Sequence, residues 1–198
     1  KDFTINKERF GDLNELIDEM KALGIRLVPI IDAGVKIEEG YDVYEEGIEK
    51  GYFCTDIDGK PFSAGVWPGL THFPDFLNEE AGLWFGMKYK ALTDLGIEGF
   101  WNDMNEPAIF YSEKGIENFY KKLEEITNGD KSVDNYNKLK DIVNSLQNSQ
   151  NDYNSIYHNV NGTKYKHNDI HNIYGYKMTE CTAKALEKIR PNERTLLF

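Results

Sequence analysis

The sequence contains little cysteine, no long apolar run and fewer basic than acidic residues. Its two cysteines, Cys54 and Cys181, lie far apart among 198 residues, which excludes a disulfide framework and a cysteine-rich zinc cluster. We therefore expect free thiols in a reducing compartment and a cytoplasmic location. No apolar stretch approaches the length of a membrane span and no signal-peptide pattern opens the sequence, so we expect no membrane partner.

The charge balance narrows the class of ligand. The 34 acidic residues exceed the 23 lysines and arginines, which gives a net charge of −11. Such an excess disfavours binding to nucleic acid or to anionic lipid, whereas a neutral small molecule such as a sugar is unaffected. Because 40% of the residues are hydrophobic, the chain can still bury a sizeable core. We expect a folded domain, or a part of one, that binds a small molecule.

The first third of the sequence begins with a helix and a strand. Apolar residues recur at helical spacing over 10–23, between Asn6 as a candidate N-cap and Gly24 as a stop, and predict one helix. The following run, 25–31, is short and rich in β-branched residues, which indicates a buried strand. Pro29 weakens this prediction because proline donates no hydrogen bond to a strand ladder.

A second helix and strand follow a long irregular region. Residues 33–75 show no sustained period and contain many glycines and aromatics, which predicts a long structured loop of the functional kind. Asn78 is typical of an N-cap, the helical stripe after it ends at Gly96, and 97–101 is the next strand. The alternation of helices and strands predicts an α/β fold with a parallel sheet.

The remainder of the sequence changes in composition. Residues 111–170 are rich in Asn, Lys, Asp and Ser, with candidate helices at 115–126 and 132–147, and we interpret them as an insertion. A helix over 172–189 and a strand over 194–198 resume the main pattern. Both ends of the sequence stop abruptly, so we expect a truncated domain.

The stretch GFWNDMNEPAIF, residues 99–110, begins as a buried strand and ends in carboxylates and amides. Strand residues alternate between faces, so Trp101 and Asp103 are expected on one side, with Asn102 and Met104 on the other. Asp32 ends the earlier strand in the same way. Since the carboxyl ends of parallel strands line the binding crevice of α/β folds, the sequence predicts two carboxylates beside an aromatic ring in a sugar site.

The chemistry of glycoside cleavage suits this arrangement. An oxocarbenium-like transition state needs one carboxylate beside the anomeric carbon and a second carboxyl group that protonates the leaving oxygen. Asp103 is the candidate nucleophile, and hydrogen bonds from Asn102 or Asn105 are expected to keep it ionised. Carboxylates also end many strands as helix caps or solvated loop residues, so the pattern alone leaves both interpretations open.

The motif FWNDMNEP at residues 100–107 resembles the signature of glycoside hydrolase family 31, the α-glucosidase and α-xylosidase family. Three other parts of the sequence resemble segments of the same family in the same order: VPIIDAG at 28–34, GVWPG at 65–69 with FPDF at 73–76, and HNIYG at 171–175.

The resemblance implies a partial (β/α)₈ TIM barrel, with residues 1–198 forming part of one catalytic domain and a helical insertion at about 111–170. It implies a retaining, exo-acting α-glucosidase without metal or organic cofactor, whose acid/base aspartate lies beyond the end of this chain. Asp103 matches the nucleophile, and Glu106 matches a glutamate that we expect to be a buried support. Further positions match the walls of the terminal-sugar pocket: Ile30, Asp32, Trp67, Trp101 and Met104.

Several alternatives stay open. An α-xylosidase or an α-transglucosidase would share the same motifs, and a non-catalytic carbohydrate-binding barrel would share the fold. A metal-dependent hydrolase would need a ligand cluster. His167 and His171 are four residues apart, but Asn168 stands where the zinc-protease motif needs glutamate, so we expect these histidines to be solvated or packed.

Overall fold

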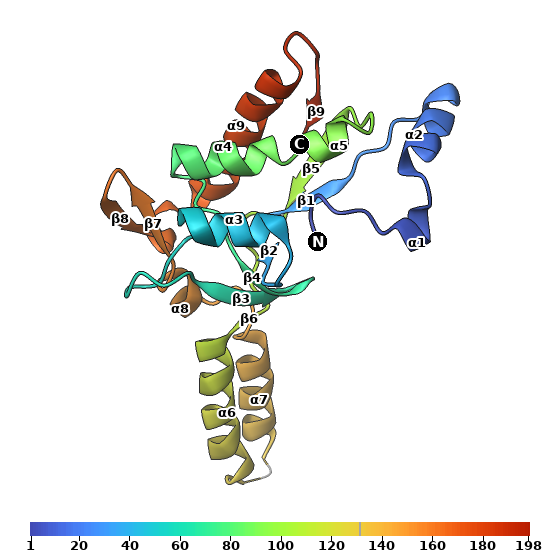
Figure 1. The fold of residues 1–198 in the computed structure, drawn as a ribbon. Coiled ribbons are helices and arrows are strands. Elements are labelled where there is room, and N and C mark those ends of the chain that lie inside the picture. The colour runs from blue at the N-terminus through green and yellow to red at the C-terminus, as the bar shows by residue number, and fades with distance from the viewer. Residues whose placement is uncertain (131) are drawn as a thin grey trace.

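The computed structural model describes residues 1–130 and 132–198, and three parallel strands form its centre (Figure 1). The sheet order is β1-β5-β9, with β5 in the middle. Helices precede and connect these strands, which confirms the α/β class and corresponds to a piece of the expected barrel. The strands are β1 (Ile30–Asp32), β5 (Gly99–Asp103) and β9 (Leu196–Leu197).

The predicted first helix is wrong in one respect, because it consists of two segments, α1 (Lys7–Phe10) and α2 (Leu13–Ala22). Gly11 adopts a φ of 59° between them, and Asp12 then caps α2 by accepting from the amides of Asn14 and Glu15. The first strand is also shorter than predicted. It starts only after Pro29, which lacks the amide that a ladder needs.

The region expected to be a long loop contains regular structure, so that prediction is wrong. Its strands join a later one in an antiparallel sheet of order β2-β4-β3-β6. Each strand has two to four residues, which is too short for a hydrophobic period to emerge. The elements are β2 (Val35–Lys36), α3 (Asp42–Lys50), β3 (Ser63–Val66), β4 (Gly69–His72) and β6 (Tyr111–Ser112).

The second predicted helix begins as expected but is interrupted. Asn78 caps α4 (Glu79–Met87), and its side-chain oxygen accepts from the amides of Glu80 and Ala81. The chain then tightens through i→i+3 hydrogen bonds before α5 (Lys90–Thr93). The turn between the two helices leaves Tyr89 completely buried, where its hydroxyl donates to Asn102 Oδ1 at 2.6 Å.

The insertion between β6 and the last long helix forms a helical hairpin that projects from the rest of the molecule (Figure 1). Neither α6 (Glu113–Thr127) nor α7 (Val133–Asn144) contains a buried residue. The chain returns to the main body through α8 (Gln150–Tyr153) and the hairpin of β7 (Tyr157–Val160) and β8 (Thr163–Lys166). The predicted pair of helices is thus confirmed, and their surface is mostly solvated.

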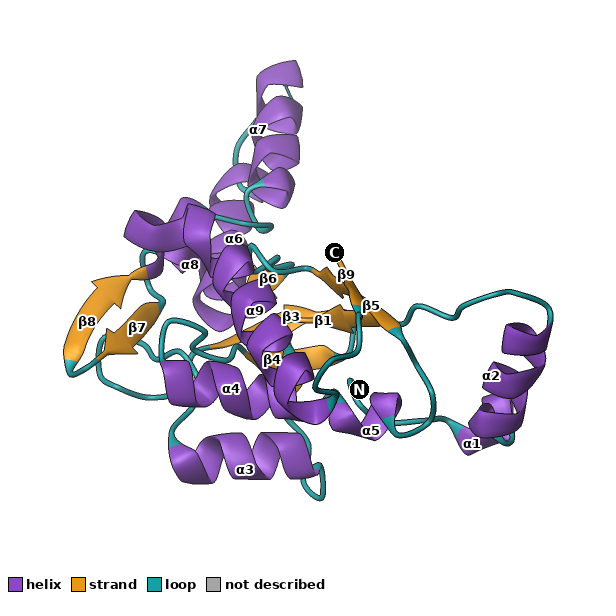
Figure 2. Cartoon of the chain, turned by 90° about the horizontal axis from the view of Figure 1, so that it is seen from above, coloured by secondary structure: helices purple, strands orange, loops and turns teal. Residues whose placement is uncertain are grey.

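The last helix, α9 (His167–Ile189), starts five residues before the predicted 172–189 and packs along α4 (Figure 2). Cys54 and Cys181 are both buried and unpaired with each other, as expected for free thiols. Within the described residues, no helix is both long enough and apolar enough to cross a bilayer.

The close approach of α4 and α9 depends on glycine. A Cβ atom added at Gly82 would lie 2.3 Å from Cys181 Sγ, and one added at Gly86 would lie 2.6 Å from the Ala185 Cβ atom. Real Cβ atoms do not come so close to other heavy atoms. The two glycines therefore set the distance between the helices that cover one side of the sheet.

We predict that Gly82→Ala destabilises the protein although alanine is the better helix former. An overpacked core costs about 1–3 kcal/mol of unfolding free energy, more than the roughly 1 kcal/mol that helix propensity returns. Adding Cys181→Ala removes the clashing sulfur and should restore part of the loss. The check is urea unfolding of the single and double variants in the complete protein. A Gly82→Ala variant that is more stable than the wild type would contradict this packing.

Candidate active site

The parallel pairing of β1 with β5 brings the two predicted carboxylates together. Asp32 and Asp103 are Cα partners at the ends of their strands, and Ile30 is the partner of Trp101. Side chains alternate along β5 as predicted: Phe100 is buried, Trp101 is 41% exposed and Asn102 is buried again. The helix-facing side thus carries Phe100 and Asn102, and the opposite side carries the carboxylates.

The face that carries the carboxylates is not covered by a helix in the described residues. Ile30 is 50% exposed, while Asp32 and Asp103 are partly buried. The helix-facing side is packed instead, with the Phe100 ring edge-on to Tyr89 at 4.9 Å. In a (β/α)₈ barrel the helices cover the outer face of the sheet. The uncovered face with the carboxylates therefore corresponds to the interior of the barrel, which opens at the carboxyl ends of the strands.

A third carboxylate, Asp2, joins the pair, and the sequence reasoning did not find it. Its Oδ1 accepts from the Asp32 amide at 3.4 Å, and its backbone oxygen accepts from the Tyr41 hydroxyl at 2.9 Å. No strand or cap pattern surrounds it in the sequence, so only the fold reveals its position.

The carboxylates perturb one another. Burial and then the charge of Asp32 raise the pKa of Asp2 to about 7. Burial and then the charge of Asp103 raise the pKa of Asp32 above its ordinary value. At the strand ends, the negative charge of one carboxylate therefore makes ionisation of a neighbouring carboxyl group less favourable. Many acid–base sites show this electrostatic pattern.

The chain turns sharply after Asp103, and two expectations are wrong there. Met104 has a φ of 54°, a left-handed conformation that ends the alternation, so Met104 does not continue the Asn102 face. The Glu106 side chain is exposed and not buried, because the following turn directs only its backbone inward. Its supporting role remains a prediction.

The amides expected to hold Asp103 are engaged elsewhere. Asn102 faces the helices, where its Oδ1 accepts from Tyr89. Asn105 packs against Gly175 of α9, where an added Cβ would lie 3.1 Å from the amide group. Within the part of the chain that the structure describes, neither amide donates to the Asp103 carboxylate, which leaves its oxygens available to a ligand.

The two tryptophans predicted to line the sugar pocket pack against different aromatic rings. Trp67 lies at the turn between β3 and β4, is 72% exposed, and meets the Phe110 ring edge-on at 4.9 Å. Trp101 stacks on Phe198 with ring centres 5.6 Å apart. Because Phe110 belongs to the segment after Asp103, and its amide donates to the Gly65 carbonyl, the Trp67 turn is tied to the end of β5.

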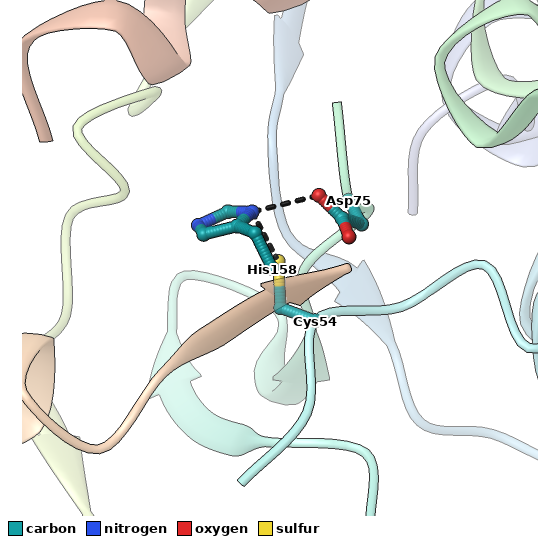
Figure 3. Close-up of side chains that lie close together, drawn as sticks. All are labelled: Cys54, Asp75 and His158. Carbon is teal, nitrogen blue, oxygen red and sulfur yellow. Dashed lines mark hydrogen bonds and ion pairs between the residues drawn. The ribbon is translucent and has the colours of Figure 1, made fainter. Parts of the chain in front are cut away.

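Among the residues that the structure describes, one group of side chains has a composition suited to a metal: Cys54, Asp75 and His158 (Figure 3). His158 Nδ1 lies 2.7 Å from Asp75 Oδ1 and 3.5 Å from Cys54 Sγ. Two ligands about 2.0–2.1 Å from a tetrahedral zinc ion lie roughly 3.3 Å apart, so the carboxylate–imidazole distance fits a hydrogen bond better than a shared ion. His167 is buried and His167 Nε2 lies 3.1 Å from His171 Nδ1, as expected for packed histidines.

A large cavity of about 1110 Å³ lies between α4, α9 and the β7–β8 hairpin. Glu79, Lys177 and Cys181 are among its lining residues, and none of the predicted site residues is. Its charges are mixed and it lies away from the strand ends. The partly open carboxylate face is therefore the better candidate for chemistry.

Comparisons with known proteins agree with this geometry. The sequence model described as "Glycosyl hydrolases family 31 TIM-barrel domain" matches residues 1–198. The chain is 49% identical over 115 residues to Alpha-glucosidase 2 of Bacillus thermoamyloliquefaciens, covering 58% of this chain and 15% of that protein. It is 36% identical over 115 residues to Alpha-xylosidase 1 of Arabidopsis thaliana, covering 57% of this chain and 12% of the relative.

Solved structures show the same fold. A glucosidase II alpha subunit bound to DNJ matches 100% of this chain and 18% of its own, with a TM-score of 0.67 and 26% identity. A Flavobacterium johnsoniae dextranase of this family in complex with glucose matches 100% of this chain and 20% of its own, with a TM-score of 0.69 and 19% identity. The chain thus spans a small part of each relative, and it belongs to glycoside hydrolase family 31 as a partial TIM-barrel domain.

Proposed function

We propose that the chain supplies the nucleophile half of a retaining, exo-acting α-glucosidase that releases terminal non-reducing α-linked glucose. The observation that carries this proposal is the position of Asp103, partly buried at the end of β5, beside Asp32 and on the uncovered face of the sheet. The relatives named α-glucosidase favour glucose as the sugar. The free cysteines fit the cytoplasmic location that we propose.

In the proposed mechanism Asp103 attacks C1 of the terminal glucose while the bond from C1 to the leaving oxygen breaks. A carboxylic acid that we place outside residues 1–198 gives its proton to that oxygen. The result is a covalent glycosyl-aspartate, which water then hydrolyses with return of the proton to the acid. Two inversions at C1 retain the anomeric configuration.

The remaining residues of the face are assigned to binding. Asp32 accepts hydrogen bonds from sugar hydroxyls, and Trp67 and Trp101 offer ring faces and edges to the apolar side of a pyranose. Ile30 and Met104 complete the wall, and Glu106 supports the turn. No metal or organic cofactor takes part in this scheme.

Two close alternatives remain. The identity to Alpha-xylosidase 1 favours xylose as a second candidate sugar, and a sugar hydroxyl in place of water would give an α-transglucosidase with the same covalent intermediate. A non-catalytic carbohydrate-binding barrel is less well supported, because a binding site has no need of a group of mutually repelling carboxyls.

We predict that Asp103→Asn in the complete protein lowers turnover of an aryl α-glucoside by at least about 10³-fold, because the amide is a poor nucleophile. Circular dichroism should show an unchanged fold. A mechanism-based fluoroglycoside should attach to the peptide that contains Asp103 in the wild type and not in the variant. Near-native turnover, or attachment to Glu106, would contradict the assignment.

We predict that Trp67→Ala raises KM for the same substrate about tenfold, since lost stacking of about 1–1.5 kcal/mol corresponds to that factor. Trp67→Phe keeps an aromatic surface and serves as the matched control. It should recover most of the affinity, while kcat changes little in either variant. Equal KM values for wild type and Trp67→Ala would place Trp67 outside the sugar site.

A further inference from the structure

A buried line of hydrogen bonds connects the FPDF segment to the turn that follows Asp103. His158 Nδ1 lies 2.7 Å from Asp75 Oδ1, His158 Nε2 lies 3.0 Å from His167 Nδ1, and His167 Nε2 lies 2.8 Å from the Glu106 carbonyl oxygen. Both histidines are 0% exposed and Asp75 is 3% exposed. We call Asp75, His158 and His167 the histidine network.

The number of protons in the histidine network follows from its ends. A carboxylate and a backbone carbonyl are both acceptors, and the three hydrogen bonds between them need three protons. Two neutral imidazoles supply only two. The network therefore holds one extra proton, and the only direction that satisfies the carbonyl is donation from His167 Nε2.

The surroundings locate that proton. Burial, together with the neighbouring His158 and His171, lowers the pKa of His167 to about 3, which keeps this ring neutral. Asp75 Oδ2 accepts from the Asn159 amide at 2.7 Å. Burial raises the pKa of the Cys54 thiol, so it adds no second negative charge. The extra proton then lies in the hydrogen bond between Asp75 Oδ1 and His158 Nδ1.

The Glu106 carbonyl, which accepts the last hydrogen bond of the histidine network, is close in sequence to the proposed nucleophile, Asp103. Glu106 is three residues after Asp103, and Met104 between them has a left-handed φ of 54°, a conformation that needs support from its surroundings. The same helix that carries His167 also packs Gly175 against Asn105, and the Tyr153 hydroxyl donates to the Pro107 carbonyl at 3.3 Å. The turn is thus held from outside the strand.

We propose that the histidine network is a positioning device for the nucleophile: the hydrogen bond between Asp75 and His158 fixes His167 as a donor to the Glu106 carbonyl, and this bond sets the course of the turn behind Asp103. His158 and His167 touch no substrate in this scheme and act through the backbone. The inference rests on the proposed function of Asp103 and adds three residues to it that lie outside the sugar pocket.

The test compares two substitutions of His167, each of which keeps a polar group at the position of only one of the two ring nitrogens. His167→Gln retains a donor where Nε2 lies, and His167→Asn retains only a polar group where Nδ1 lies. His167→Gln loses the contact with His158, and His167→Asn loses the contacts with the Glu106 carbonyl and with His171, so both should lower Tm. We expect His167→Asn to lower kcat for an aryl α-glucoside about 10–100-fold with little change in KM, because small misplacements of a reacting group have effects of this size. His167→Gln should remain within about fivefold of wild type.

Equal kcat values for the two variants would overturn the inference, because filling the core does not depend on which nitrogen is replaced. A wild-type enzyme without turnover would instead refute the proposed function. In that event the network can still be tested by ¹⁵N-histidine NMR at pH 7, with assignments from the His158 and His167 variants. We expect a proton on Nε2 of His158 and on Nε2 of His167. A proton on His167 Nδ1, or stoichiometric zinc in the purified protein, would overturn the proposal.

Discussion

The parallel register between β1 and β5 is the interaction on which the site depends. It pairs Asp32 with Asp103 and Ile30 with Trp101, and it places Ile31 and Asn102 together on the buried side. Because strand side chains alternate, a slip of one residue in either strand would turn its carboxylate toward the helices. The proposed chemistry therefore needs the hydrophobic face of each strand as much as it needs the acids.

A polar contact inside the helix-facing layer helps to specify this register. Asn102 is buried, and its Oδ1 accepts from the Tyr89 hydroxyl at 2.6 Å, while its backbone amide donates at 2.6 Å to the carbonyl of Phe198, the residue after β9. The Asn102 side-chain oxygen is satisfied by Tyr89, whereas Nδ2 is buried without a partner among the described residues. A buried oxygen without its donor would cost free energy, so the Tyr89 contact favours this register. The turn between α4 and α5 contributes to this contact, since it places the Tyr89 hydroxyl next to Asn102.

The sequence was most informative where local chemistry decides structure. The Asn78 cap, the alternation along 99–103 and the helices of the insertion needed only neighbouring residues, and all are present. The antiparallel sheet that strands of 33–75 form with β6 could not be predicted, because strands of two to four residues carry no period. Asp2 and the histidine network were missed for another reason: their partners lie tens of residues away, and only the fold brings them together.

The insertion combines a solvated part with a part that the site uses. Its two long helices contain no fully buried residue, so their length and sequence can change at little cost to the core. The returning segment is different, because the Asn148 side chain accepts from the Ile109 amide at 2.7 Å, Tyr153 reaches the Pro107 carbonyl, and His158 pairs with Asp75. These contacts fasten both sides of the turn behind Asp103. β5 presents Asp103, and the segment after the hairpin of α6 and α7 fixes the backbone that follows Asp103.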